Sequence, residues 1–301
     1  MKNVIAIIWD FDKTLIDGYM QAPIFKEYNI DESKFWEEVN SMPEKYAAEG
    51  IRVNRDTAYL IQFTRMAKDG IFKGLNNAKL RSYGTMQHFY PGIPDFIKQT
   101  KDMLKDDAEC SEYNIKIEHY IVSTGFAEVI RGTELYNLVD GIWGCELLEG
   151  PDRNGENVIS DASYVIDNTS KTKALFEINK GINKKPDLNV NTKMGDDLRR
   201  VAFSNMIYIA DGPSDVPAFS LIKKYGGSTF AIYPAGNDKA FKQVEQLRKD
   251  GRIDMFAEAN YREGTTAYMW ITSKIKEYAE LIKQRERNRM STVSEVPKHL
   301  V

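Results

Sequence analysis

An uninterrupted apolar run, Val4 to Trp9, stands near the start of the chain and is followed at once by Asp10 and Asp12. A run of this kind, rich in Val and Ile, predicts a strand buried on both faces of a parallel sheet. Ligand crevices of open α/β sheets lie at the carboxyl ends of such strands. Alternation along an extended chain directs both carboxylates to the same side. Two like charges held so close favour a bound cation or a shared proton.

The length and composition set the limits within which this strand must fold. With 301 residues, of which 42% are hydrophobic, the chain can form a core domain with a smaller insert. Its 41 basic and 44 acidic residues nearly balance, so no global field favours nucleic acid or an anionic membrane. Cys110 and Cys145 are far apart and have no metal-ligand spacing, which predicts unpaired thiols in a reducing compartment.

The same chain shows no sign of export or of a membrane span. The apolar run before Asp10 is too short for a signal-peptide core, and no apolar run reaches about eighteen residues. We therefore expect a soluble cytoplasmic protein with a small-molecule partner, no nucleic acid and no membrane. The oligomeric state is left open.

Two later segments repeat the arrangement of polar residues behind an apolar strand. A predicted strand at 117–122 ends in Ser123, Thr124 and Gly125, just before a predicted helix from about Ala127. A hydroxyl, a glycine and a helix N-terminus at a strand end suit an anion such as phosphate. A third predicted strand, 206–210, ends in Asp211-Gly212-Pro213-Ser214-Asp215, which adds two carboxylates at the end of another strand.

Taken in order, these segments resemble the four motifs of the haloacid dehalogenase superfamily, within its phosphoserine-phosphatase-like branch. The matching segments are Asp10-Phe11-Asp12-Lys13-Thr14-Leu15, Ile121-Val122-Ser123-Thr124-Gly125, Lys171, and Ile209-Ala210-Asp211-Gly212-Pro213-Ser214-Asp215. The resemblance covers roughly residues 1 to 235. It implies an α/β fold, with a three-layer Rossmann-like parallel sheet core and a helical cap domain inserted after the first strand.

The pattern between these motifs agrees with an insert. Residues 20–89 have helical periodicity and no apolar strand run. We expect 1–18 and 90–301 to form the catalytic core and 19–89 to form the cap. Within the core, the pattern of residues 137–170 predicts two short strands joined by a loop beside the main sheet. Residues 285–301 are expected to form a loosely ordered tail. The resemblance implies that the cap closes over a substrate, and a rigid helical decoration is the alternative.

The resemblance also implies an activity, a Mg²⁺-dependent phosphatase that hydrolyses a small phosphomonoester through an aspartyl-phosphate. Asp10 would be the nucleophile and Asp12 the general acid and base. Lys171 would neutralise charge on the phosphoryl oxygens, with Lys173 as the alternative lysine. The residues expected to bind phosphate are Ser123, Thr124 and Gly125. The carboxylates expected around the Mg²⁺ ion are Asp10, Asp12, Asp211 and Asp215.

Other functions remain compatible with parts of this pattern. Asp12 speaks against a dehalogenase, because a departing halide needs no proton. A phosphomutase and a non-catalytic Mg²⁺-dependent binding module both stay open. The substrate is not fixed, because the stretch after Leu15 has no Glu matching the one expected in phosphoserine phosphatase. The arginines of the insert that could hold an anionic substrate are Arg52, Arg55, Arg65 and Arg81.

Overall fold

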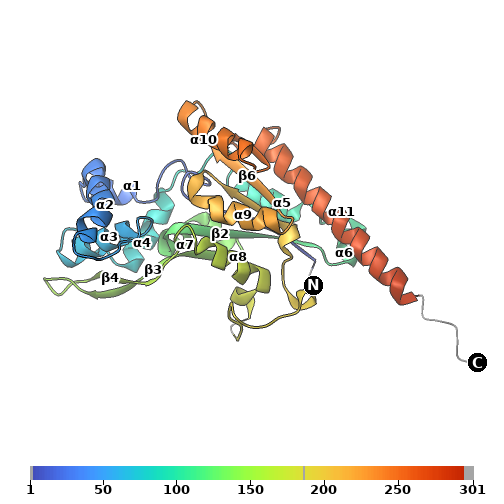
Figure 1. The fold of residues 1–301 in the computed structure, drawn as a ribbon, viewed down its shortest axis with the longest axis horizontal. Helices are drawn as coiled ribbons and strands as arrows, with labels where there is room; N and C mark the ends of the chain where they lie inside the picture. The colour runs from blue at the N-terminus through green and yellow to red at the C-terminus, as the bar shows by residue number, and fades with distance from the viewer. Residues whose placement is uncertain (1–2, 186, 295–301) are drawn as a thin grey trace, which may run out of the picture.

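The computed structural model describes residues 3–185 and 187–294, which build a seven-stranded sheet in the order β4-β3-β2-β1-β5-β6-β7 (Figure 1). Strand β4 is antiparallel to β3, and the other neighbouring strands are parallel. The strands are β1 (Val4–Trp9), β2 (Lys116–Phe126), β3 (Gly141–Pro151), β4 (Asn157–Tyr164), β5 (Met206–Ala210), β6 (Ser228–Tyr233) and β7 (Met255–Glu258). The predicted α/β fold is confirmed.

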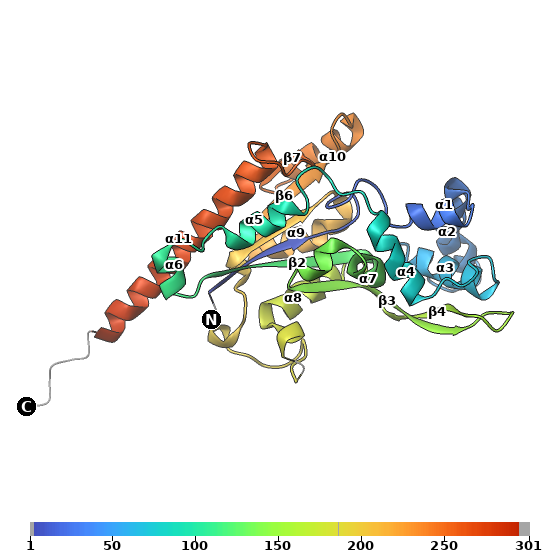
Figure 2. The same ribbon diagram turned by 180° about the vertical axis from the view of Figure 1, so that it is seen from behind.

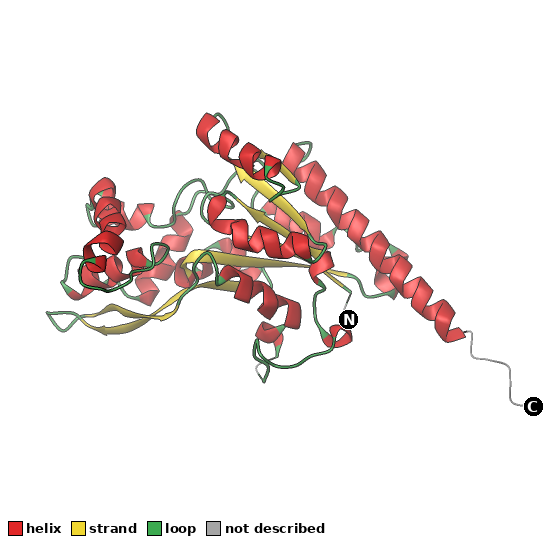
Figure 3. Ribbon diagram, in the orientation of Figure 1, coloured by secondary structure: helices red, strands yellow, loops and turns green. Residues whose placement is uncertain are grey.

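Helices cover both faces of this sheet and form three layers with it (Figures 2 and 3). One face carries α5 (Asp95–Asp102) and α11 (Thr266–Ser294), and the other carries α8 (Lys171–Lys180), α9 (Val216–Lys224) and α10 (Asp238–Lys249). Every residue of β1 is buried, as its apolar run predicts. Trp9 of β1 packs edge-on against Phe96 of α5, with ring centroids 6.1 Å apart.

The predicted helical insert lies between β1 and α5, beyond the carboxyl ends of the central strands (Figure 1). Its helices are α1 (Ala22–Glu27), α2 (Glu32–Ala47), α3 (Ala58–Lys68), α4 (Asn77–Ser82) and the 3₁₀ turn η1 (Tyr83–Met86). Phe63 of α3 stacks on Phe25 at 5.6 Å and also meets Phe126, the last residue of β2, at 5.1 Å. Aromatic packing therefore joins the insert to the end of the sheet.

The two segments that connect the insert to the sheet pair with each other. The N–H of Asp17 donates to the carbonyl of His88, and the N–H of Tyr90 donates to the carbonyl of Leu15, both at 2.9 Å. Residues on either side of the insert, distant in sequence, thus meet in one short ribbon. The chain enters and leaves the insert at the same place.

The hairpin β3–β4 extends from the edge of the sheet to the insert. The N–H of Ile159 donates to the carbonyl of Leu75 at 2.8 Å, and Lys68 of α3 pairs with Asp161 at 3.1 Å. Two strands beside the main sheet were predicted here, but they have 11 and 8 residues and are longer than expected. The sequence analysis did not foresee their contact with the insert.

Helix α11 runs to Ser294, so the prediction of a loosely ordered tail from Arg285 is wrong for residues 285–294. Residues 295–301 lie outside the described part of the chain. The charged residues that suggested a tail are paired in the structure. Arg287 forms an ion pair with Glu109 of α6 (Ala108–Glu112), and Arg285 donates to the side chain of Asn205 at 3.0 Å.

Two further expectations concern the thiols and the membrane. Cys110 and Cys145 are free, as predicted, and both are buried. Across residues 3–185 and 187–294, no helix combines the length and the apolar character that crossing a membrane requires.

Candidate active site

Three carboxylates meet where the central strands end. Asp10 follows β1 and Asp211 follows β5, and the N–H of Asp10 donates to the carbonyl of Ile209 at 2.9 Å, which ties these strand ends together. The 3₁₀ turn η6 (Pro213–Asp215) then brings Asp215 back towards Asp10. One carboxylate oxygen from each of the three aspartates lies within 4.8 Å of the others.

Lys171, the first residue of α8, places its ammonium between two of these carboxylates. Its Nζ lies 2.9 Å from Oδ1 of Asp10 and 2.6 Å from Oδ1 of Asp215, and the side chain is 1% exposed. Burial alone would lower the pKa of Lys171, but the charges of Asp10 and Asp215 raise it above its usual value. Lys173 instead pairs with Glu177 at 3.7 Å on the surface. The geometry therefore selects Lys171 as the lysine next to Asp10.

Asp215 is held by three donors. Besides Lys171, the hydroxyl of Tyr208 donates to Oδ1 at 2.6 Å and the hydroxyl of Ser214 donates to Oδ2 at 2.9 Å. Tyr208 lies in β5 and is fully buried. Sequence reasoning missed it, although a tyrosine inside an apolar strand signals a hydroxyl that needs a buried partner. Asp215 and Tyr208 thus fix the position of the Lys171 ammonium.

Asp12 stands apart from the three clustered carboxylates. Its Oδ1 accepts the N–H of Met20 at 2.9 Å, across a tight loop in which Lys13 has a left-handed φ of 56°. Burial raises the pKa of Asp12 to about 7. The carboxyl can therefore hold a proton near neutral pH, as a general acid must.

The cluster carries an excess of negative charge. Burial raises the pKa of Asp10 well above its usual value against the opposing charge of Lys171. Burial and then the charge of Asp215 raise the pKa of Asp211 to about 6. Three carboxylates face one ammonium, so the site favours an additional cation.

The donor set fits a hard divalent cation. Asp211 accepts no hydrogen bond from another side chain within residues 3–185 and 187–294, and Asp10 uses only Oδ1 to accept Lys171. Opposite oxygen ligands of Mg²⁺ are about 4 Å apart, close to the spacing of this cluster. Asp10 and Asp211 could hold such an ion directly, while Asp215 is occupied by its three donors.

The segment Ser123–Gly125 lies within β2, because this strand continues to Phe126 and is longer than the predicted strand at 117–122. The N–H of Gly125 donates to Oγ of Ser123 at 3.0 Å. A Cβ at Gly125 would lie 2.3 Å from Cε of Met20, so this glycine makes room for a methionine. The helix that follows, α7 (Ala127–Arg131), has only five residues. A phosphate-binding role for Ser123, Thr124 and Gly125 stays a prediction.

A cavity of about 450 Å³ lies between the insert and these strand ends. Asp12 and Thr124 line it on the side of the sheet, and Trp36, Arg55 and Tyr59 line it on the side of the insert. The hydroxyl of Tyr59 donates to the carbonyl of Thr124 at 2.6 Å and joins the two sides. Thr124 is thus the member of the predicted phosphate-binding segment that faces this space.

The arginines that were expected to hold an anionic substrate lie in different places in the structure. Arg55 lines the cavity and pairs with Glu44 at 3.2 Å. Arg65 donates to the hydroxyl of Tyr46, and Arg81 pairs with Glu128. The remaining residue of that set, Arg52, is exposed.

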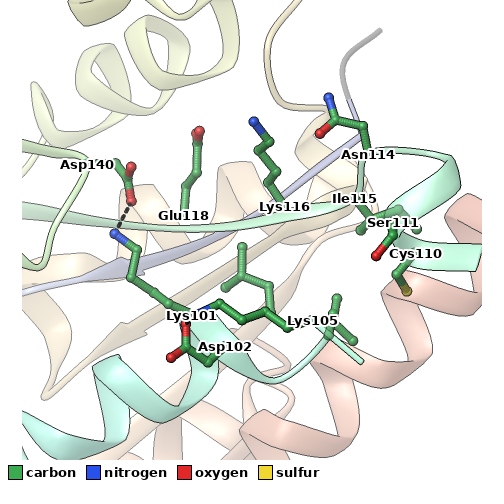
Figure 4. Close-up of a pocket in the computed structure, with 12 residues that line it drawn as sticks. Lys101, Asp102, Lys105, Cys110, Ser111, Asn114, Ile115, Lys116, Glu118 and Asp140 are labelled. Carbon is green, nitrogen blue, oxygen red and sulfur yellow. Dashed lines mark ion pairs between the residues drawn. The ribbon is translucent and has the colours of Figure 1, made fainter. Parts of the chain in front are cut away.

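Another cavity, of about 620 Å³, lies at the opposite end of the sheet (Figure 4). Lys116 and Glu118 at the start of β2 line it, and Lys101 pairs with Asp140 across it at 3.1 Å. Because Asp10 lies at the carboxyl ends of the strands, this cavity is not part of the candidate active site.

Comparison with known proteins identifies a relative in sequence. An uncharacterized protein of Borreliella burgdorferi is 36% identical over 288 residues, which span 91% of this chain and 97% of that one. The chain belongs to the same family as that protein. No protein-family model matches it.

Comparison with solved structures identifies the fold. A HAD family hydrolase from Salmonella enterica serovar Typhi aligns with a TM-score of 0.52 and 15% identity, over 89% of this chain and 70% of that one. This chain has the haloacid dehalogenase fold. An apo phosphoserine phosphatase also aligns, with a TM-score of 0.49 and 16% identity, over 87% of this chain and 97% of that one. The haloacid dehalogenase fold predicted from the four motifs is confirmed.

Proposed function

We propose that this protein is a Mg²⁺-dependent phosphatase that hydrolyses a small phosphomonoester through an aspartyl-phosphate intermediate. The observation that carries the proposal is the desolvated Asp10 carboxylate, 2.9 Å from the buried Lys171 ammonium and next to Asp211. A carboxylate can act as a nucleophile and divide one difficult displacement into two easier ones. We also propose that residues 19–89 act as a cap over a core formed by 1–18 and 90–301.

In the first step, an oxygen of Asp10 attacks the phosphorus of the substrate. The new bond joins Asp10 to phosphorus as the bond between phosphorus and the leaving oxygen breaks. Asp12, whose pKa near 7 keeps part of it protonated, gives its proton to that leaving oxygen. The products are an alcohol and the aspartyl-phosphate.

In the second step, water attacks the same phosphorus. Asp12, now ionised, takes a proton from the water, and the bond between phosphorus and Asp10 breaks. Inorganic phosphate leaves, and both aspartates return to their starting states.

Charge on the phosphoryl oxygens needs compensation throughout, and electrostatic stabilisation provides most of the catalysis in such reactions. Lys171 supplies one fixed positive charge, held in place by Asp215. A Mg²⁺ ion bound by Asp10 and Asp211 would supply the second, with Thr124 near the transferred group. Ser123 is buried, and together with Gly125 it would complete the phosphate-binding segment at this strand end.

The test is release of inorganic phosphate from p-nitrophenyl phosphate and a panel of phosphomonoesters, in Mg²⁺ and in EDTA. We expect activity only with Mg²⁺, and a loss on the order of ten-thousandfold for Asp10→Asn. Asp106→Asn, at an exposed position, is the matched control and should retain activity. An Asp10→Asn rate equal to that of the parent would refute the mechanism. Mg²⁺ binding without any phosphate release would favour the non-catalytic binding module.

A further inference from the structure

The cavity above Asp12 has to receive the leaving group of the substrate, if the proposed function holds. A phosphoryl group at Asp10 directs its leaving oxygen towards Asp12, the proposed acid, and Asp12 lines this cavity. The remaining walls come from the segment that carries Tyr19 and Gln21, from α2, from α3 and from the loop that carries Arg55 and Asp56. The side chains of those walls therefore indicate which leaving group fits.

Aromatic rings form one side of the cavity. Trp36 lies between Tyr19 and Tyr59, with ring centroids 5.9 Å and 6.2 Å away. Lys13 already covers the ring of Tyr19, with its Nζ 3.9 Å from the centroid. Trp36 and Tyr59 remain as rings for a ligand, and a desolvated cation over such rings is strongly favoured.

The charged groups of the cavity are mainly negative. Glu32 and Asp56 both line it, whereas its one guanidinium, Arg55, already pairs with Glu44 at 3.2 Å. Glu32 accepts the indole N–H of Trp36 through Oε1, and Asp56 accepts the N–H of Asn168 through Oδ2, both at 3.3 Å. The second oxygen of each carboxylate has no hydrogen bond within residues 3–185 and 187–294.

A buried amide adds a hydrogen-bond acceptor that lacks a donor. Gln21 lines the cavity with 3% of its surface exposed, and within the described part of the chain its buried Oε1 has no partner. An unpaired buried acceptor costs free energy until a donor reaches it. A ligand that brings an N–H group would satisfy it.

We propose that the leaving group is an amino alcohol, so that the substrates are phosphomonoesters whose alcohol carries a protonated amine. The ammonium lies against Trp36 and Tyr59, and Glu32 and Asp56 balance its charge. One of its N–H groups donates to Gln21.

The test compares O-phosphoethanolamine with propyl phosphate, which replaces the ammonium by a methyl group. We expect kcat/KM to be at least about tenfold higher for O-phosphoethanolamine. Glu32→Gln should lower the ratio of the two kcat/KM values about fivefold, and Trp36→Leu should lower it as well. Glu37→Gln, on the same helix but outside the cavity, is the matched control and should leave the ratio unchanged.

Hydrolysis of p-nitrophenyl phosphate separates this inference from the proposed function. If that ester and both test esters are inert in Mg²⁺, the phosphatase proposal itself fails. If p-nitrophenyl phosphate is hydrolysed and propyl phosphate is as good as O-phosphoethanolamine, the phosphatase stands and the cationic leaving group is overturned. A preference for glycerol phosphate over O-phosphoethanolamine would overturn it too.

Discussion

Removing one carboxylate from the cluster should stabilise the protein when no metal is present. Burial and Asp215 raise the pKa of Asp211 to about 6, so the folded state holds this proton more tightly than the unfolded chain does. Above pH 6 the ionised carboxylate therefore destabilises the fold, and the penalty vanishes below the ordinary value of 3.8. The difference amounts to roughly 3 kcal/mol, since a tenfold change in proton affinity is worth about 1.4 kcal/mol.

The assay is thermal unfolding of the parent and of Asp211→Asn at pH 7.5 and pH 4, each in EDTA and in excess Mg²⁺. At pH 7.5 in EDTA, the variant should melt up to about 6 °C higher, at roughly 2 °C for each kcal/mol. At pH 4 the two melting temperatures should converge. Mg²⁺ should raise the melting temperature of the parent and have little effect on the variant, because a ligand stabilises only the state that binds it.

The matched control is Asp106→Asn, which removes an exposed carboxylate outside the cluster. It should show neither the gain in EDTA nor the loss of the Mg²⁺ response. The reasoning is refuted if Asp211→Asn melts below the parent in EDTA at pH 7.5, or if its advantage persists at pH 4.

Three further predictions follow from other charged groups. Lys171→Met leaves buried carboxylates unpaired and should cost about 3–5 kcal/mol in denaturant unfolding. Adding Asp215→Asn should recover part of that loss, and a double variant no more stable than the single one would contradict this. Because the pKa of Asp12 is about 7, kcat/KM for propyl phosphate should fall above pH 7. The fall should be weaker for p-nitrophenyl phosphate, whose leaving group needs no proton, and equal falls would argue against Asp12 as the acid. A hydrogen bond from Lys283 lowers the pKa of Asp107 to about 2. The ionised Asp107 carboxylate therefore stabilises the folded state above pH 4, and this stabilisation is lost towards pH 2. Asp107→Asn should therefore be less stable than the parent at pH 7 and equal to it near pH 2, as measured by urea unfolding, and a constant difference would exclude this pairing.

The sequence predicted the parts of the site that follow buried strands. The carboxyl ends of parallel strands meet at one edge of a sheet, which predicted that Asp10 and Asp211 lie near each other. The structure places them together because β1 and β5 are neighbours in the sheet. The choice of Lys171 over Lys173 came from a resemblance. The structure explains it, because the first residue of α8 faces the cluster and Lys173 faces solvent.

Other parts depended on contacts between segments that no local pattern reveals. Gly125 was interpreted as a position where phosphate comes close to the backbone. The neighbour that occupies the space beside it is Met20, more than a hundred residues earlier in the chain. The cavity forms only where the insert meets the end of β2, so no local pattern indicated the roles of Trp36 and Gln21. The end of α11 was misjudged because its charges pair with Glu109 on another helix.

The short ribbon formed by residues 15–17 and 88–90 brings the two ends of the helical insert together at one place. Closing a loop whose ends are already hydrogen-bonded costs little more when the loop is long than when it is short. A change in the length of the insert therefore carries little entropic cost, and the hydrogen bond between Asp10 and Ile209 lies outside the insert. A fold with this connectivity can acquire a new substrate specificity while its catalytic residues stay in place.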